Sequence, residues 1–221
     1  MIAAVIFDMD GLIVDSEPYW RIAETKIFGN LSVAPAEADF EKMMGRQINE
    51  VIQYWHQMHP WENYSLAHTQ KQILSEVEKL VIENSVLLPG VLEIISFLKN
   101  KNISIALASS SPTSLINGIT KHFGIFDQFE IICSAEYEKS GKPHPAVFLT
   151  TAKLLKVNAE SCLVLEDSYN GVLAAKAAQM KCIAVPCKEH FSQTRFDIAD
   201  LKLNSLKEFS LDHWEMLCNK N

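Results

Sequence analysis

The sequence predicts an α/β protein with a Rossmann-like, doubly wound parallel sheet and one inserted all-helical segment. Short, continuous apolar runs recur along the chain, and helical patterns separate most of them. One long interval shows helical periodicity and no convincing strand. This combination indicates a parallel sheet covered by helices on both faces, because such strands are buried on both sides and joined by helical crossovers.

Five runs rich in β-branched residues are expected to form the buried strands. They occupy residues 1–6, 103–108, 129–133, 162–166 and 182–186. Apolar residues at helical spacing predict the core helices. These helices are expected over residues 90–101, 113–123, 144–156 and 170–180.

The strandless interval, residues 16–87, is predicted to be a helical cap, with residues 1–15 and 88–221 forming the α/β core. Both crossings lie beside the carboxyl end of the first strand. Ligands bind at that edge in open α/β sheets, so the insertion is placed to act as a lid.

Local signals mark where the cap begins and ends. Ser16 is expected to cap the first helix, with Glu17 and Pro18 in its opening turn. Pro89 and Gly90 punctuate the return to the core. The tryptophans of the insertion are expected to pack inside the cap.

Composition narrows the possible partners and compartment. The 221 residues carry a formal net charge of -7 and no run of Lys or Arg, which argues against a nucleic-acid partner. The apolar N-terminus is interrupted by Asp8, well short of a membrane span. The five cysteines contain no CxxC pair, which is typical of a reducing compartment. We therefore expect a cytoplasmic protein without a membrane partner, and nothing in the sequence requires more than a monomer.

Polar side chains follow the apolar runs where the predicted strands end. Because the carboxyl ends of parallel strands meet at one edge of a sheet, these side chains are expected to face a single crevice. They are Asp8 and Asp10 after the first strand, Ser109 after the second, Lys142 after the third, and Glu166 and Asp167 at the fourth.

Several acidic groups in one cleft require a compensating cation. Hard oxygen ligands with few His or Cys alternatives favour Mg²⁺, which usually also contacts substrate phosphate. The metal and Lys142 would neutralise the charges of the carboxylates and the phosphate. Asp8 could then attack phosphorus and form an aspartyl-phosphate. Asp10 would then serve as general acid and base.

Four motifs, DMDGLIVDSE, ALASSS, SGKPHP and LEDSYNG, resemble those of the haloacid dehalogenase superfamily, in its phosphatase branch with a helical cap. The resemblance spans nearly the whole chain. It implies the following roles: Asp8 as nucleophile and metal ligand, Asp10 as acid/base and a ligand through its backbone carbonyl, Ser109 and Lys142 as phosphate-holding groups, and Glu166 and Asp167 as magnesium binders.

Within the insertion, MMGRQINEVI is similar to a cap motif of the same superfamily. The arginine of that motif often reaches the substrate in relatives, which implies a substrate-binding role for Arg46. The likeness is strongest to small sugar phosphatases of the 2-deoxyglucose-6-phosphatase kind. The expected activity is Mg²⁺-dependent hydrolysis of small hexose or hexitol phosphates.

Two alternatives remain open. A phosphomutase similar to the β-phosphoglucomutases is disfavoured because those enzymes typically carry His where this chain has Trp20. A phospho-accepting receiver module is disfavoured because such modules lack a long insertion after the first strand. Carbon–halogen cleavage is not expected, since the parent dehalogenases lack an acid at the position of Asp10.

Overall fold

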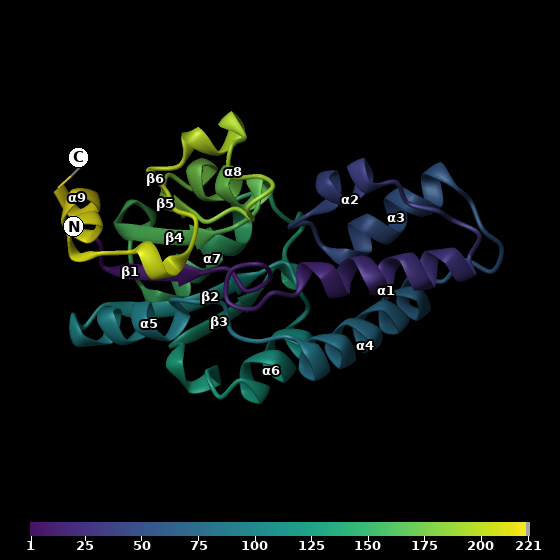
Figure 1. Ribbon diagram of the computed structural model, residues 1–221, viewed down its shortest axis with the longest axis horizontal. Coiled ribbons are helices and arrows are strands. Elements are labelled where there is room, and N and C mark those ends of the chain that lie inside the picture. Colours follow the sequence, from purple (N-terminus) through teal and green to yellow (C-terminus); the bar gives the residue numbers. More distant parts are fainter. Residues whose placement is uncertain (220–221) are drawn as a thin grey trace.

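The computed structural model describes residues 1–219, except the side chains of residues 37, 38 and 41. Its centre is a six-stranded parallel sheet with the strand order β3-β2-β1-β4-β5-β6 (Figure 1). The predicted α/β class with a doubly wound parallel sheet is thereby confirmed. The strands are β1 (Ala4–Phe7), β2 (Ser104–Ser109), β3 (Ile131–Ser134), β4 (Cys162–Glu166), β5 (Lys181–Ala184) and β6 (Leu201–Lys202).

The predicted strands match β1 to β5 with shifts at their ends, but β6 was not predicted. It has only two residues, both partly exposed, and it pairs with β5 alone. A segment this short has no apolar run from which periodicity could be read. Its pairing depends on tertiary contact with the existing sheet edge.

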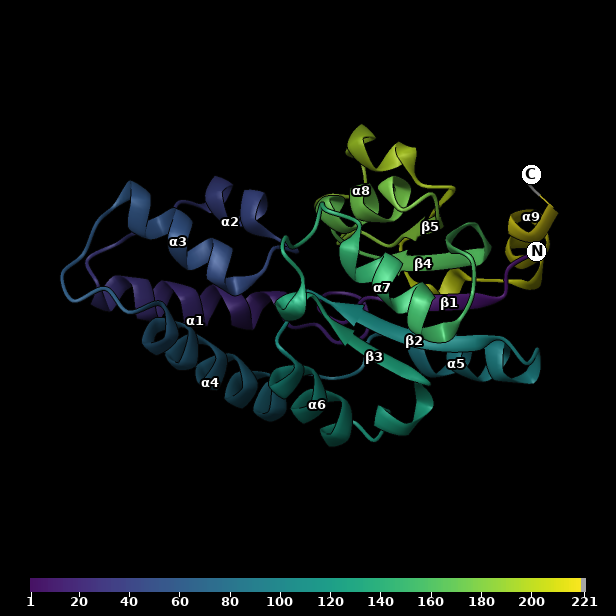
Figure 2. The same ribbon diagram turned by 180° about the vertical axis from the view of Figure 1, so that it is seen from behind.

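Helices cover both faces of the sheet, as Figures 1 and 2 show. Side chains that alternate along β1 enter two separate buried clusters: Val5 and Phe7 belong to one, Ala4 and Ile6 to the other. The first cluster also contains residues of α5 (Val91–Asn100), α6 (Thr113–His122) and α9 (Leu211–Asn219). The second contains residues of α7 (Ala146–Leu155) and α8 (Tyr169–Ala177).

Short 3₁₀ turns complete the connections around the sheet. They are η1 (Phe126–Gln128), η2 (Ala135–Tyr137), η3 (Ala159–Ser161), η4 (Thr194–Ile198) and η5 (Leu206–Glu208). Among the described residues, the helices are all too short or too polar to cross a lipid bilayer.

Four helices fill the interval between β1 and β2 and lie together beyond one end of the sheet (Figures 1 and 2). We call them the cap helices: α1 (Glu17–Asn30), α2 (Glu37–Met43), α3 (Ile48–Met58) and α4 (Leu66–Asn84). Their buried residues include Phe28, Ile52, Trp55 and Ile73, which belong to the same cluster as Val5 and Phe7. The exact domain boundaries at residues 15/16 and 87/88 stay a prediction.

The two linkers between sheet and cap run side by side. Val14 and Leu87 form an antiparallel bridge, and the amide of Leu88 donates to the carbonyl of Ile13 at 2.8 Å. The hydroxyl of Ser85 donates to the carbonyl of Asp15 at 3.0 Å. These contacts hold the linker that leaves the sheet, residues 13–15, against the linker that returns to it, residues 85–88.

The prediction that Ser16 caps α1 through its side chain is wrong. The Ser16 hydroxyl makes no capping hydrogen bond and instead donates to Asp10 Oδ1 at 2.7 Å. Its backbone is also helical, which removes the extended geometry that a capping side chain needs. The opening turn contains Glu17 and a proline, as expected.

Candidate active site

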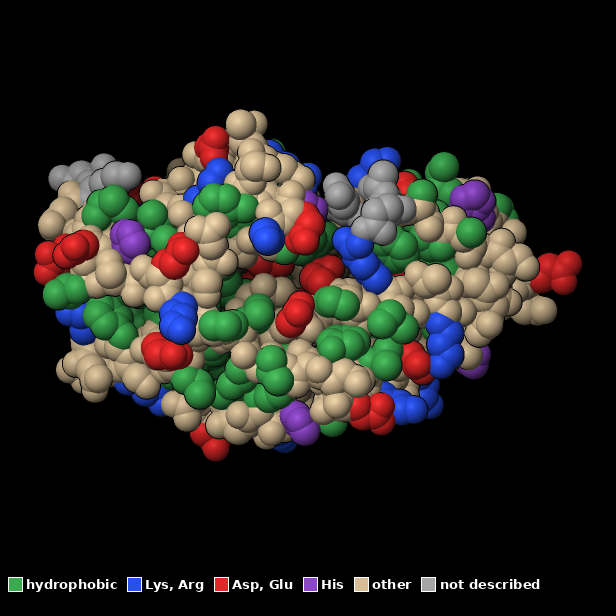
Figure 3. Space-filling model, viewed as in Figure 1, with side chains coloured by type: hydrophobic (Ala, Val, Ile, Leu, Met, Phe, Trp, Pro, Cys, Tyr) green, Lys and Arg blue, Asp and Glu red, His purple; other side chains and the backbone are tan. Residues whose placement is uncertain are grey.

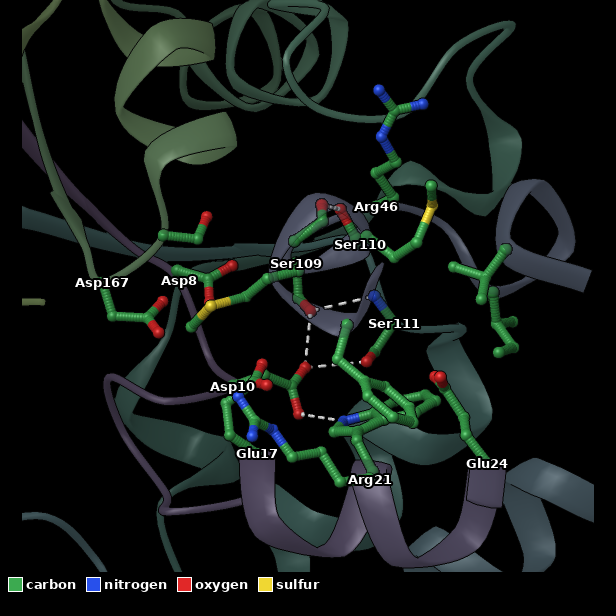
Figure 4. Close-up of a pocket in the computed structure, with 18 residues that line it drawn as sticks. Asp8, Asp10, Glu17, Arg21, Glu24, Arg46, Ser109, Ser110, Ser111 and Asp167 are labelled. Atoms are coloured by element: carbon green, nitrogen blue, oxygen red, sulfur yellow. Dashed lines mark hydrogen bonds between the residues drawn. The ribbon is translucent and has the colours of Figure 1, made fainter. Parts of the chain in front are cut away.

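The predicted polar residues meet at the carboxyl edge of the central strands. Phe7 of β1 is in register with Leu107 of β2 and Leu165 of β4, so the residues that follow these positions lie next to one another. The amide of Asp8 donates to the Leu165 carbonyl at 3.0 Å. This register places Asp8 beside the ends of β2 and β4, and Figure 4 shows it close to Asp167.

Lys142 reaches this edge from the segment before α7 and is almost completely buried. Its ammonium donates to Asp8 Oδ1, to Glu166 Oε1 at 2.7 Å and to the Ala108 carbonyl at 3.3 Å. It also lies 4.8 Å from the centre of the Phe148 ring. A buried ammonium with two carboxylate partners is held in one place, beside the candidate nucleophile.

Three buried carboxyl groups are close enough to share a metal ion. One carboxylate oxygen each from Asp8, Glu166 and Asp167 lies within 4.8 Å of the others. Asp167 is 3% exposed, and its carboxylate accepts no hydrogen bond from the residues that the structure describes. Among the described residues, Lys142 is the ammonium bound to this group, so the three carboxylates exceed the positive charge by two when all groups are ionised. An oxygen-only donor set with this excess fits a divalent hard cation such as Mg²⁺.

The pKa shifts of these carboxyl groups also indicate an excess of negative charge at the site. Burial raises the pKa of Asp8 well above its usual value; the Lys142 charge opposes this shift, and the Glu166 and Asp10 charges reinforce it. Burial also raises the pKa of Asp167, with the charges of Glu166 and Asp8 acting in the same direction. Burial alone lowers the pKa of Lys142, but the charges of Asp8 and Glu166 outweigh it, and the net shift is upward. The cluster therefore favours a bound cation.

Glu166 is already engaged through both carboxylate oxygens. Oε1 accepts from Lys142, and Oε2 accepts from the Ser168 amide at 2.8 Å and the Ser168 hydroxyl at 3.0 Å. Gly171, in the first turn of α8, packs so closely on this carboxylate that a Cβ would lie 1.7 Å from Oε1. The Glu166 side chain is thus fixed in an orientation that positions Lys142.

Asp10 does not join the carboxylate cluster through its side chain. Its Oδ1 accepts from the Ser16 hydroxyl at 2.7 Å and from the Trp20 indole N–H at 3.0 Å. Its Oδ2 accepts from the Ser111 hydroxyl at 2.7 Å and the Ser109 hydroxyl at 3.3 Å (Figure 4). Four donors, two from the start of the cap segment and two from the end of β2 and the segment after it, fix the direction of this carboxylate.

Ser109, the predicted phosphate-binding residue, is buried at the end of β2. Besides donating to Asp10, its hydroxyl accepts from the Ser111 amide at 3.0 Å. Sequence reasoning did not assign a role to Ser111 or Trp20 in the site. The run of three serines left the contact ambiguous, and a tryptophan one helical turn into α1 reads as a packing residue.

A pocket lies between this edge of the sheet and the cap helices. Asp8, Asp10, Ser109 and Asp167 line it from the sheet side. The cap side supplies Glu17, Trp20, Arg21, Glu24, Phe40, Met43, Met44, Gly45, Arg46, Ile48 and Val51. In the space-filling view, acidic side chains gather in the hollow between sheet and cap (Figure 3).

Arg46 lines the rim of this pocket, but its side chain is exposed. In Figure 4 its guanidinium points away from Asp8 and Asp10. Its predicted contact with the substrate stays a prediction.

The loop before α3 is docked on the α/β core, at α8, η2 and the segment after β2, through three hydrogen bonds. The carbonyl of Met44 accepts from the Asn170 amide group at 2.8 Å, and the carbonyl of Gly45 accepts from the Ser110 hydroxyl at 2.6 Å. Slightly farther along, the Gln47 side chain donates to the Ala135 carbonyl. The cap helices are therefore closed over the pocket in this structure.

We expect Gly45→Ala to lower kcat/KM by about 10- to 100-fold while the chain still folds, because it prevents this docking. Gly45 has φ +78°, and a Cβ there would lie 2.6 Å from Ser168 Oγ, the hydroxyl that also bonds Glu166. The measurement is steady-state phosphate release with a matched variant, Gly29→Ala. A Cβ at Gly29 meets nothing within 4 Å, so that variant should keep full activity. Equal activity of the two variants would contradict the prediction.

The raised pKa of Glu24, a buried residue of α1, predicts that the free energy of unfolding decreases as pH rises above about 5. Burial, with the Glu17 charge as a smaller cause, raises the pKa of Glu24 from 4.5 to about 8. Between these values the folded chain binds more protons than the unfolded chain, so the free energy of unfolding falls as pH rises through this window. In Glu24→Gln this loss should be absent. The variant should gain about 3 kcal/mol relative to wild type between pH 5 and pH 8.

Urea unfolding of both proteins in EDTA at several pH values measures this difference. The comparison cancels the other titrating groups to first order, since both proteins share them. Parallel stability curves for wild type and Glu24→Gln would show that the Glu24 carboxyl titrates as an exposed group.

The site contains a buried aspartate that contacts a lysine and lies beside two further carboxyl groups. It lies at the carboxyl edge of a parallel sheet and is covered by helices. This arrangement is typical of enzymes that transfer phosphoryl groups. The chain belongs to the haloacid dehalogenase-like hydrolase family, whose model matches residues 5–185.

Similar proteins agree with this assignment. The chain is 38% identical to hexitol phosphatase B of Escherichia coli K12 over 210 residues, 95% of each chain. It is 31% identical to the phosphorylated carbohydrates phosphatase of Thermotoga maritima over 180 residues, 81% of this chain and 83% of the relative. The crystal structure of β-phosphoglucomutase from Clostridium difficile superposes with a TM-score of 0.87 and 27% identity, covering 99% of this chain and 98% of that one. The receiver alternative is not supported, since these relatives are enzymes.

Proposed function

We propose that this chain hydrolyses phosphate monoesters of small sugars and hexitols, releasing the alcohol and inorganic phosphate through an aspartyl-phosphate at Asp8. The observation that carries the proposal is the burial of Asp8 against Lys142 and within 4.8 Å, between carboxylate oxygens, of Glu166 and Asp167. The phosphatase relatives named above support the substrate class.

Asp8 is the nucleophile in this proposal. Lys142 bonds one of its oxygens, and the second oxygen accepts no hydrogen bond from the described residues, which leaves a lone pair for attack on phosphorus. The attack forms an O–P bond to Asp8 and breaks the ester O–P bond. Lys142, fixed by Glu166, balances the negative charge that the phosphoryl group brings into the site.

Asp10 serves as the general acid and base. It protonates the leaving alkoxide in the first step and accepts a proton from the water that attacks the aspartyl-phosphate in the second. The hydrogen bonds from Ser16, Trp20, Ser109 and Ser111 set the direction of its carboxylate. Proton transfer by a side chain held in this way contributes roughly 10²- to 10⁴-fold to such reactions.

The same residues would hold Mg²⁺. Asp8 and Asp167 offer oxygens that are not already saturated by hydrogen bonds, and the Asp10 backbone carbonyl is proposed as a further ligand. Glu166 completes the negative charge of the site, although both of its oxygens already accept hydrogen bonds. A bound Mg²⁺ supplies charge neutralisation for the phosphoryl oxygens and the nucleophile.

Ser109 and Lys142 are proposed to hold the phosphate, and Arg46 to contact the substrate when it occupies the pocket. The domain division at residues 15/16 and 87/88, a monomeric state and a cytoplasmic location belong to the same proposal. Gel filtration of the purified chain tests the monomeric state.

Phosphate release from a panel of hexose, hexitol and nucleoside phosphates, with and without Mg²⁺, tests the function. We expect fast release from hexose and hexitol phosphates that is lost in EDTA and restored by Mg²⁺. Interconversion of two sugar phosphates in the presence of a bisphosphate, with little phosphate loss, would instead identify a mutase.

A further inference from the structure

A buried carboxyl group on the cap side of the pocket has no role in the chemistry described so far. Glu24 of α1 is only 7% exposed and lines the pocket. Figure 4 shows its carboxyl directed into the pocket from the same helix that supplies Glu17 and Arg21. Within the described part of the chain, its side chain makes neither a hydrogen bond nor an ion pair, and the nearby charge of Glu17 is of the same sign.

The absence of a partner is costly for the fold. A buried polar group that has lost its water and gained no hydrogen bond destabilises the folded chain. An apolar side chain at this position would avoid the cost, because the other buried residues of α1, Ala23, Ile27 and Phe28, are apolar. A hydrogen-bond partner for this carboxyl group would come from the pocket, into which it is directed.

The surroundings show what kind of contact it can make. Phe40, Met43, Ile48 and Val51 form the apolar wall of the pocket on the cap side. Ligand pockets typically combine such walls with a few placed polar groups that fix orientation. On this wall, Glu24 is positioned to be such a group.

The geometry of α1 sets the distance between Glu24 and the catalytic carboxylates. Trp20 bonds Asp10, and Glu24 lies one helical turn farther along α1, about 6 Å along the axis. A substrate whose phosphate lies at Asp8 would therefore present its far end, not its phosphate, to Glu24.

We propose that Glu24 is a specificity residue that hydrogen-bonds hydroxyl groups of the substrate remote from its phosphate, so that the site selects polyhydroxylated phosphate monoesters over unhydroxylated ones. This inference rests on the proposed phosphatase function. A hydroxyl is the expected partner because the hexitol and carbohydrate phosphates on which the proposed function rests carry several hydroxyl groups. A carboxyl group can accept from one hydroxyl with each oxygen.

The experiment compares two monoesters with the same six-carbon chain, sorbitol 6-phosphate and n-hexyl phosphate. Both have primary alcohol leaving groups, so the chemical step is matched and only the hydroxyl groups differ. The variants are Glu24→Leu, which removes the hydrogen-bonding group, and Glu24→Gln, which keeps one acceptor and a donor. Glu83→Leu, which removes an exposed carboxylate from α4, is the control.

We expect Glu24→Leu to lower kcat/KM for sorbitol 6-phosphate by about 10- to 100-fold and to leave that for n-hexyl phosphate unchanged or higher. Glu24→Gln should lose less, and Glu83→Leu should lose nothing on either ester. Without substrate, Glu24→Leu should unfold at no lower temperature than wild type, whereas a structural role would lower it.

Equal losses on both esters, or no loss on sorbitol 6-phosphate, would overturn the inference. A wild-type preference for glucosamine 6-phosphate that Glu24→Leu abolishes would also overturn it, since the partner would then be an ammonium group. If wild type released phosphate from none of these esters in Mg²⁺, the proposed function itself would fail, which is a distinct result.

Discussion

Replacing Asp8 with Asn is expected to lower kcat by about 10⁴-fold or more while the chain keeps its fold. The amide has the size of the carboxyl group but no negative charge, so it does not attack phosphorus. Lys142 keeps its second partner, Glu166 Oε1 at 2.7 Å, and stays in place. The variant also removes one of three crowded buried carboxyl groups, so the folded state should be no less stable than wild type without metal.

Steady-state phosphate release, with thermal unfolding as the folding check, measures this effect. Asp212→Asn, an exposed change in the first turn of α9, is the control and should match wild type. Near-normal turnover by a folded Asp8→Asn protein would rule out Asp8 as nucleophile.

The second large effect is expected for Asp10→Asn, with kcat on alkyl phosphates reduced by roughly 10²- to 10⁴-fold. Asparagine can still accept from Trp20 and Ser16 through its oxygen, so the local structure should persist. What it loses is the proton that the leaving alkoxide needs. The first step should recover with p-nitrophenyl phosphate, whose leaving group departs as an anion.

Pre-steady-state kinetics distinguish the first step from the second. With p-nitrophenyl phosphate, Asp10→Asn should give a burst of nitrophenol and then a slow steady state, because removal of a proton from the attacking water is still impaired. An equal loss on both esters, with no burst, would contradict the acid/base role of Asp10 and point to a purely structural one.

The fold and the central residues of the site could be predicted from the sequence for one physical reason. Parallel strands buried on both faces appear as continuous apolar runs, and the residue that follows each run must lie at the common carboxyl edge. That reasoning placed Asp8, Ser109 and Glu166 together, and the register of β1 with β2 and β4 shows the strand ends side by side.

Other features depend on contacts between distant segments, which periodicity does not reveal. The Ser16 hydroxyl bonds Asp10 instead of its own helix, and Trp20 donates to the same carboxylate instead of only packing in the cap. Glu24 looks like an ordinary polar helix residue in the sequence, but it is buried in the fold. The direction of the Asp10 side chain, and the choice among three serines, were likewise set by tertiary structure.

The paired linkers have a consequence for how the enzyme cycles between substrates. Because Val14 and Leu87 pair and Leu88 bonds Ile13, the cap helices are tethered at two adjacent points and not through one flexible strand. A double tether permits a swing about one axis but opposes twisting and drift. Two short, paired linkers thus keep the cap side chains at a high effective concentration beside the nucleophile.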